Sequence, residues 1–174
     1  PPPSYEPPPY EGGGGGGGDV DIAGDPCPTS RAGAYEALSN LATGSPSAAP
    51  YIAAARAAGL DIVLNRDHFV SFNPTGNYIA WDPFSAASGQ NRDGSYWVES
   101  PTLGLIHEII HWHAPTMSHD DVYTLVNQIA RELNTNTGSS NSANRSSVGG
   151  STFLVNDTDS VKWDLANQRP GCGT

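Results

Sequence analysis

The chain has 174 residues, a length that suits one globular domain. It carries 8 Lys and Arg residues against 18 Asp and Glu residues, a formal net charge of −10. This balance disfavours nucleic acid and anionic membrane surfaces as partners, because both require neutralising basic residues. No stretch is long and apolar enough to cross a bilayer. Because nucleic acid and membrane surfaces are disfavoured, we expect a protein or a small molecule as partner.

The N-terminal 18 residues, PPPSYEPPPYEGGGGGGG, combine a proline-rich run with seven consecutive glycines. Such a composition cannot bury enough apolar surface to offset chain entropy. We therefore predict a disordered linker over 1–24 and a folded domain over 25–174. The chain starts without Met, so we expect it to be part of a longer protein, in which an upstream module provides export and delivery.

The next segments predict two short helices followed by strands. Apolar residues at helical spacing that end at a glycine indicate helices over 30–41 and 50–59. Four short runs rich in β-branched and aromatic residues follow, at 61–64, 68–72, 77–82 and 96–99, with hairpin-turn chemistry at 73–76. Together they predict a small antiparallel meander.

Two further helices come next. Ser100 and Pro101 are typical of a helix start, and Pro115 ends that helix. A second helix begins at the capping pair Ser118 and Asp121, and its apolar stripe repeats every 3.6 residues. The segment 134–150 is nearly all Ser, Asn, Thr and Gly, which predicts a long mobile loop before the last apolar runs.

The first of these helices contains the sequence His107-Glu108-Ile-Ile-His111. Histidines four residues apart lie on one helical face, so both imidazoles can bind one zinc ion. The Glu between them projects beside the ion and can act as general base toward the attacking water. The pattern predicts a zinc-dependent endopeptidase with Glu108 as catalytic base.

A catalytic zinc site needs a third protein ligand. If the two helices pack antiparallel around the turn at Pro115, this ligand comes from the first turns of the second helix. Asp121 is ranked first because it points inward, although it also suits a helix cap, and Asp120 and His119 remain alternatives. Glu132 would lie on the order of 16 Å too far along the helix.

Other residues receive supporting roles. Tyr123 is expected to face His107 and to stabilise an oxyanion. His113 lies off the zinc face, and His68 is expected to be structural. The strand Tyr78 to Trp81 is a candidate edge for an extended substrate.

Two cysteines, Cys27 and Cys172, are near the ends of the predicted domain. If paired, they would close a long loop and stabilise the fold by about 4 to 5 kcal/mol in the chain-entropy model. Unpaired thiols are the alternative.

The segment 77–145 resembles the NleD-type zinc metallopeptidases, a family of bacterial type III effectors and of toxin domains at the ends of polymorphic and Rhs-like proteins. The resemblance rests on Trp81 to Pro83, on SPTLGLI leading into His107, on the acidic pair Asp120-Asp121 and on the segment 127–133. It implies a cytotoxic role, with delivery into another cell.

The motif and the resemblance together predict an α+β, zincin-like fold, in which a small antiparallel sheet packs on the HExxH helix and on a following antiparallel helix. The expected function is a secreted or delivered zinc endopeptidase that acts as a monomer on a protein of the target cell. One alternative is a binding module in which zinc only fastens two helices, with no hydrolysis. A metal-free interaction domain on a stalk is a further alternative.

Overall fold

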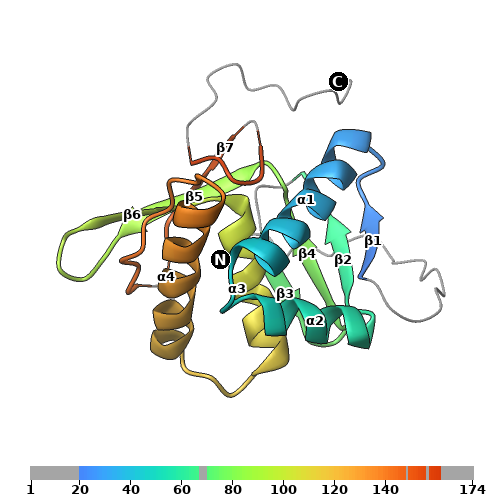
Figure 1. The fold of residues 1–174 in the computed structure, drawn as a ribbon, viewed down its shortest axis with the longest axis horizontal. Helices are drawn as coiled ribbons and strands as arrows, with labels where there is room; N and C mark the ends of the chain where they lie inside the picture. Colours follow the sequence, from blue (N-terminus) through green and yellow to red (C-terminus); the bar gives the residue numbers. More distant parts are fainter. Residues whose placement is uncertain (1–19, 67–69, 148, 156, 162–174) are drawn as a thin grey trace, which may run out of the picture.

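The computed structural model describes residues 20–66, 70–147, 149–155 and 157–161, and these form a mixed α+β fold (Figure 1). The described residues contain the following helices and strands in chain order: β1 Asp21–Gly24, α1 Pro28–Gly44, α2 Ala49–Ala58, β2 Asp61–Leu64, β3 Ser71–Asn73, β4 Tyr78–Trp81, β5 Ser85–Gln90, β6 Tyr96–Glu99, α3 Pro101–His113, α4 His119–Asn136 and β7 Ser151–Leu154. None of the described helices combines the length and the hydrophobicity needed to traverse a bilayer.

The strands form two small sheets. The first has the order β1-β2-β4-β3, with β1, β2 and β4 parallel and only β3 antiparallel. The second has the order β6-β5-β7 and is antiparallel throughout. The prediction of one antiparallel meander is therefore wrong. The connection from β1 to β2 runs through α1 and α2, which is the kind of crossover that parallel pairing requires.

The sequence analysis missed two strands for different reasons. The strand β5 reads SAASGQ and lacks β-branched and aromatic residues, whereas β1 lies inside the segment predicted as linker, 1–24. Gly24 at the end of β1 has a φ of +87°, and a Cβ there would lie 2.3 Å from the carbonyl oxygen of Leu64. Glycine at this position thus allows β1 to lie against β2.

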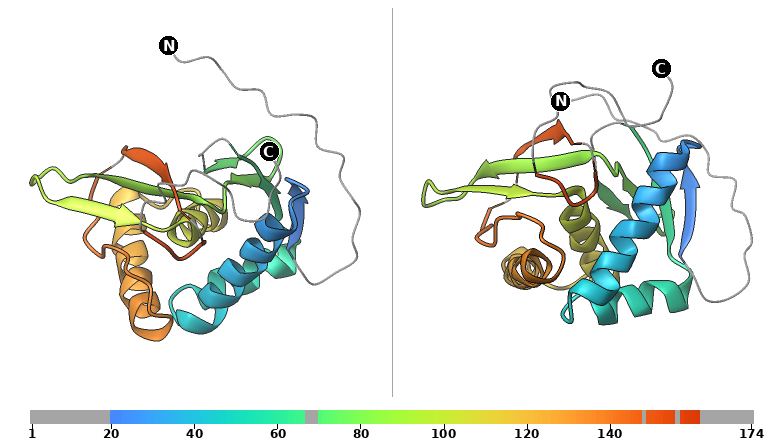
Figure 2. Two further views of the ribbon diagram at one scale, coloured as in Figure 1. Left: turned by 90° about the horizontal axis from the view of Figure 1, so that it is seen from above. Right: turned by 45° about the horizontal axis from the view of Figure 1, so that its top comes forward.

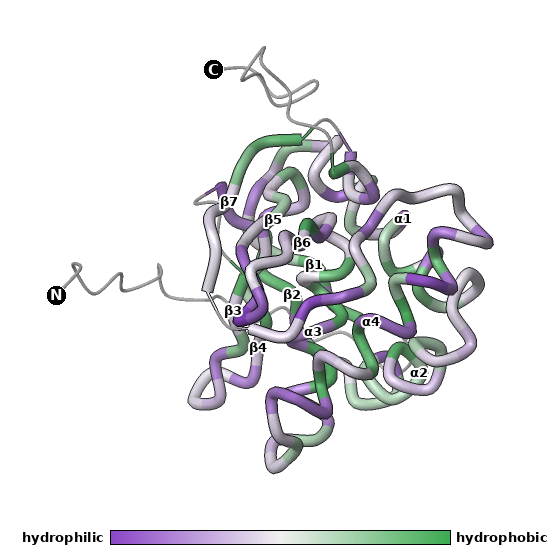
Figure 3. Tube along the Cα trace, turned by 90° about the vertical axis from the view of Figure 1, so that its left-hand side faces the viewer, coloured by the Kyte–Doolittle hydropathy of each residue, from purple (hydrophilic) through white to green (hydrophobic). Residues whose placement is uncertain are grey.

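Helix α3 is the centre of the fold. It contacts β3 and β4 of the first sheet, β5 and β6 of the second sheet, and all three other described helices (Figure 2). Its apolar residues join the buried residues of β2 and β4 in one core. Figure 3 shows the hydropathy of each residue along the chain, with apolar residues in green. Burial on nearly every side explains why this helix is apolar around most of its circumference.

The four helices lie close to their predicted positions. The second predicted helix ends at Gly59, whose left-handed φ of 61° allows its N–H to bond to the carbonyls of Ala55 and Arg56. Ser118 caps α4, and its hydroxyl oxygen accepts a hydrogen bond from the Asp121 N–H. The predicted stripe of α4 is buried at Val122, Val126, Ile129 and Leu133 and partly buried at Leu125.

The polar segment after α4 is held in place by side-chain hydrogen bonds, contrary to the prediction of a mobile loop. Asn134 bonds to both backbone groups of Asn141, and Asn127 does the same with Arg145. The Asn91 side chain donates to the Asn144 carbonyl and accepts from the Ser146 N–H. In this segment, asparagine side chains form hydrogen bonds with backbone groups that a sheet or a helix would otherwise pair.

Some sequence predictions fall outside the described residues. His68, Cys172 and the Pro- and Gly-rich segment 1–18 belong to this group. Cys27 is described and buried, with 5% of its surface exposed.

Candidate metal centre

The N-terminal end of α3 is fixed by hydrogen bonds to strand β4 and to the segment after β7, which positions the motif helix. The indole Nε1 of Trp81, at the end of β4, donates to the carbonyl of Pro101 at 3.0 Å. Thr102 donates from its N–H and from its hydroxyl to the carbonyl of Thr158. All of these residues are buried, so His107, in the second turn, belongs to a helix whose start is held by buried hydrogen bonds.

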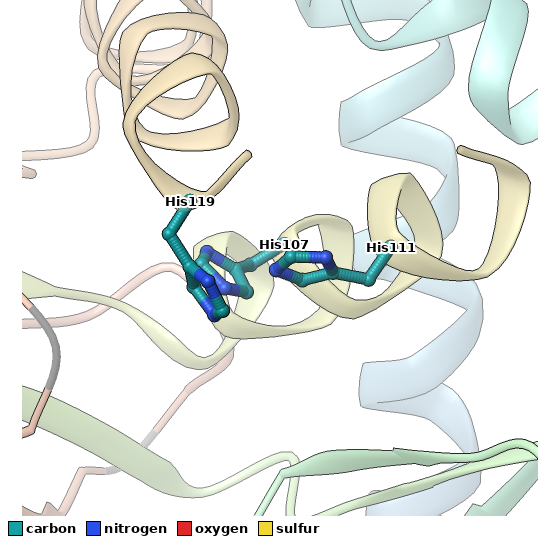
Figure 4. A group of neighbouring side chains, drawn as sticks. All are labelled: His107, His111 and His119. Carbon is teal, nitrogen blue, oxygen red and sulfur yellow. The ribbon is translucent and has the colours of Figure 1, made fainter. Parts of the chain in front are cut away.

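Three histidines converge on one point between α3 and α4. One nitrogen each of His107, His111 and His119 lies within 4.8 Å of the other two, and among the described residues no other group of this kind is found. Figure 4 shows His107 and His111 projecting from α3 toward His119 at the start of α4. The ring centroids of His107 and His111 are 4.8 Å apart.

The donor set fits a divalent metal ion. In the described part of the chain, Nδ1 of His107 and Nε2 of His111 are buried and have no hydrogen-bond partner. Burial, and then the charges of Arg145, His111 and His119, lower the pKa of His107 to about 3. The pKa of His111 is also lowered, by burial and by His119. Neutral imidazoles with unused nitrogens are suitable metal ligands.

The third histidine is His119, the lower-ranked alternative, and Asp121 is not part of the cluster. Asp121 is exposed, and its carboxylate accepts a hydrogen bond from the Ser118 hydroxyl at 2.7 Å. The capping role thus occupies the side chain that we expected to bind zinc. A signal for His119 was available, because it lies four residues before Tyr123 and hence on the same helical face.

Glu108 lies beside the histidines and is anchored to the first sheet. Its carboxylate accepts a hydrogen bond from the Phe72 N–H of β3 at 2.9 Å. Burial raises the pKa of Glu108, while the Phe72 N–H and the charge of Arg145 act in the opposite direction. A carboxylate with a raised pKa suits proton transfer near neutral pH.

Tyr123 lies where the sequence places it. Its ring centroid is 5.6 Å from that of His107 and 6.1 Å from that of His119, and the side chain is 4% exposed. Burial raises the pKa of Tyr123, so the hydroxyl keeps its proton at neutral pH and remains a hydrogen-bond donor.

Arg145, which the sequence analysis did not single out, lies close to the ring of Tyr123. The guanidinium of Arg145 is 4.9 Å from the Tyr123 ring centroid and 4.1 Å from that of Trp97. It also forms an ion pair with Glu99, which is 1% exposed. Burial raises the pKa of Glu99, and Arg145 opposes this effect. No local pattern reveals this pair, because its members are far apart in the sequence.

The remaining candidate residues are not part of the metal cluster. The ring of His113 packs edge-on against Tyr51 at 5.3 Å, and Asp120 is exposed. Glu132 accepts hydrogen bonds from Ser45 and Ser47, which join α4 to the turn between α1 and α2.

The expectation that Tyr78 to Trp81 forms a free sheet edge is wrong. Strand β4 lies between β2 and β3, so β3 is the outer strand on this side. The Phe72 N–H of β3 is already bonded to Glu108.

A cavity of about 340 Å³ opens beside His107, between α3 and residues of both sheets. His107, Glu108 and Gly104 form its wall on α3, and Trp81, Trp97 and Arg145 are among the residues opposite. A Cβ at Gly104 would lie 3.4 Å from Val70, an ordinary van der Waals contact, so glycine at this position adds room to the cavity but is not required for packing.

Comparisons of the chain with protein-family models, with curated proteins and with solved structures find no match. The assignment of function therefore rests on the residues and their geometry.

Proposed function

We propose that the protein is a zinc-dependent endopeptidase with a zincin-like active site, in which His107, His111 and His119 hold the ion. The observation that carries the proposal is the convergence of the three histidines beside a buried glutamate of the same helix. Three imidazoles leave one position of a tetrahedral zinc site for water or substrate.

When bound, zinc supplies a Lewis acid that polarises a peptide carbonyl and activates water at neutral pH. Glu108 is the general base: it takes a proton from the attacking water and then gives it to the leaving amine. The hydrogen bond from the Phe72 N–H holds the Glu108 carboxylate in position for both transfers. The Tyr123 hydroxyl donates to the oxygen that becomes negatively charged during attack.

The resemblance to NleD-type peptidases extends the proposal to the biological setting. The protein acts as a delivered bacterial toxin or effector domain and cleaves a protein of the target cell. The acidic net charge of −10 supports a protein substrate rather than nucleic acid.

The test compares the zinc-loaded wild type with Glu108→Gln in a cell lysate, with new peptide termini read by mass spectrometry. Wild type should generate new termini, and Glu108→Gln should bind zinc equally well but generate none. Glu36→Gln, an exposed acid on α1, is the matched control and should behave as wild type.

A zinc-fastened binding module is the rival function. It predicts that zinc binds, that wild type and Glu108→Gln produce the same termini, and that the ion has no exchangeable water. Either equal products or no products would overturn the peptidase proposal.

A further inference from the structure

The cavity beside Glu108 has the features of a specificity pocket. Its volume of about 340 Å³ falls within the range of ligand pockets, roughly 300 to 1,000 Å³. It reaches the metal cluster only through His107, since His111 and His119 are not part of its wall. A residue next to the scissile bond would therefore place its side chain in this cavity.

The cavity walls suit a long side chain with an apolar stem. Trp81, Trp97 and Val70 line it, and the indole groups of both tryptophans are buried. Alkyl stems of lysine and arginine side chains pack well against such surfaces while their heads reach polar groups.

One carboxylate oxygen in the cavity wall favours a cation at its end. Asp82, Glu99 and Glu108 line the cavity together with Arg145. Arg66 acts on the charge of Asp82, and a bound zinc ion would act on that of Glu108, so these two charges are partly balanced. Oε2 of Glu99 is engaged by Arg145, while Oε1 of Glu99 is buried and has no hydrogen-bond partner among the described residues. A cationic head group that donates to this oxygen would satisfy it.

Backbone pairing to the first sheet offers little for substrate recognition near the site. The inner position of β4 and the hydrogen bond of the Phe72 N–H to Glu108 leave few donors for an added strand in that sheet. Recognition through a side chain in the cavity does not depend on such pairing.

We infer that this cavity binds a lysine or arginine side chain adjacent to the scissile bond, so that the substrates are proteins cleaved beside a basic residue. The inference rests on the proposed peptidase function and names its substrate class.

The test uses zinc-loaded wild type and a peptide library that varies the residues flanking the scissile bond. Lys or Arg at one flanking position should be cleaved at least about tenfold faster than norleucine, which has a similar stem without charge. Equal cleavage of both, or a preference for an acidic residue, would overturn the inference and leave the peptidase function intact.

Asp82→Asn provides the matched variant. Its side-chain oxygen can still accept the hydrogen bond from the Phe84 N–H, so the substitution removes charge with little change of shape. The preference for Lys and Arg over norleucine should fall several-fold. Asp93→Asn, in the exposed turn between β5 and β6, is the control and should keep the wild-type preference. An unchanged preference in folded Asp82→Asn would also contradict the inference.

A binding measurement separates the two proposals. Nα-acetyl-lysine methylamide and its norleucine counterpart are titrated into zinc-loaded wild type while tryptophan fluorescence is recorded, since Trp81 and Trp97 line the cavity. Tighter binding of the lysine compound in a protein that cleaves nothing would support the pocket and refute the peptidase. Equal binding of the two compounds would refute the basic pocket.

Discussion

The rings of His111 and His119 lie with their centroids 4.8 Å apart, although the two residues belong to different helices. Only the turn at 114–118 separates α3 from α4 in the chain. A metal ion shared by the three histidines would therefore link the two helices directly. Metal affinity and the packing of α4 on α3 are then coupled, as in other sites whose ligands come from separate elements.

His119→Ala should lower zinc affinity by at least about 100-fold, since even the loss of outer partners of a ligand costs 10- to 100-fold. Asp121→Asn should change zinc affinity by less than about threefold and reduce stability by about 1 kcal/mol or less through its cap. Competition with a chromophoric chelator measures both. The opposite ranking would restore Asp121 as the third ligand.

The stability of the metal-free protein should fall as the pH drops below 6.5. The unfolded chain protonates His107 at its ordinary pKa of 6.5, whereas the folded protein holds this pKa at about 3. Unfolding therefore takes up a proton between these values, with a slope approaching about 1.4 kcal/mol per pH unit.

Denaturant unfolding in the presence of a chelator, at pH values from 5 to 7, measures this effect. The range is chosen because most carboxylates titrate below it. His107→Gln should weaken the dependence, and His113→Gln, on the exposed end of α3, should not. The same pH dependence in His107→Gln and in wild type would show that His107 is readily protonated in the fold.

Arg145→Ala should destabilise the protein by about 3 to 5 kcal/mol, because it leaves the buried carboxylate of Glu99 without its counterion. The double variant Arg145→Met with Glu99→Met should recover much of this loss. Denaturant unfolding of the single and double variants provides the measurement. A double variant no more stable than Arg145→Ala would show that packing, rather than charge, determines the effect.

Tyr123→Phe should reduce the turnover of a cleaved peptide by about 10- to 100-fold and leave zinc affinity and KM close to wild type. The phenyl ring keeps the packing against His107, so only the hydroxyl is lost. Steady-state kinetics on one peptide separates kcat from KM. Unchanged kcat would remove Tyr123 from the catalytic residues.

Glu132→Ala should lower the free energy of unfolding by about 1 to 3 kcal/mol with no change in zinc affinity. Partial burial would raise the pKa of Glu132, but hydrogen bonds from Ser45, Ser47 and Gln128 outweigh it and hold this pKa at about 2. This stabilisation is present above pH 4.5 and is lost as the pH falls toward 2. Thermal unfolding at pH 7 and at pH 3 checks both statements.

The sequence was most informative where local physics decides the structure. Pro101 and Pro115 bracket α3, Ser118 caps α4, and the spacing of His107 and His111 sets their common face. These signals need only a few neighbouring residues. Tyr123 could be placed near His107 for the same reason, since a short turn between two helices leaves few ways to pair them.

The prediction failed where distant residues decide the structure. Strand β1 pairs with β2, which follows two helices later, and β5 pairs with the distant β7 as well as with the neighbouring β6. The residues of β5 themselves favour a strand only weakly. The segment 137–147 looked like a free loop because its hydrogen bonds reach back to Asn91, Asn127 and Asn134. The pair of Glu99 and Arg145 was invisible for the same reason.

The cap at Ser118 has a further consequence for the architecture of the cluster. The cap fixes His119 as the first residue of α4. It therefore fixes the direction in which the His119 side chain points around the helix, relative to the buried Val122 and Val126. Inserting one residue between His119 and Val122 would rotate the imidazole by about 100° around α4. The ring would then point away from α3, so the phase of one helical turn determines whether the ligand set is complete.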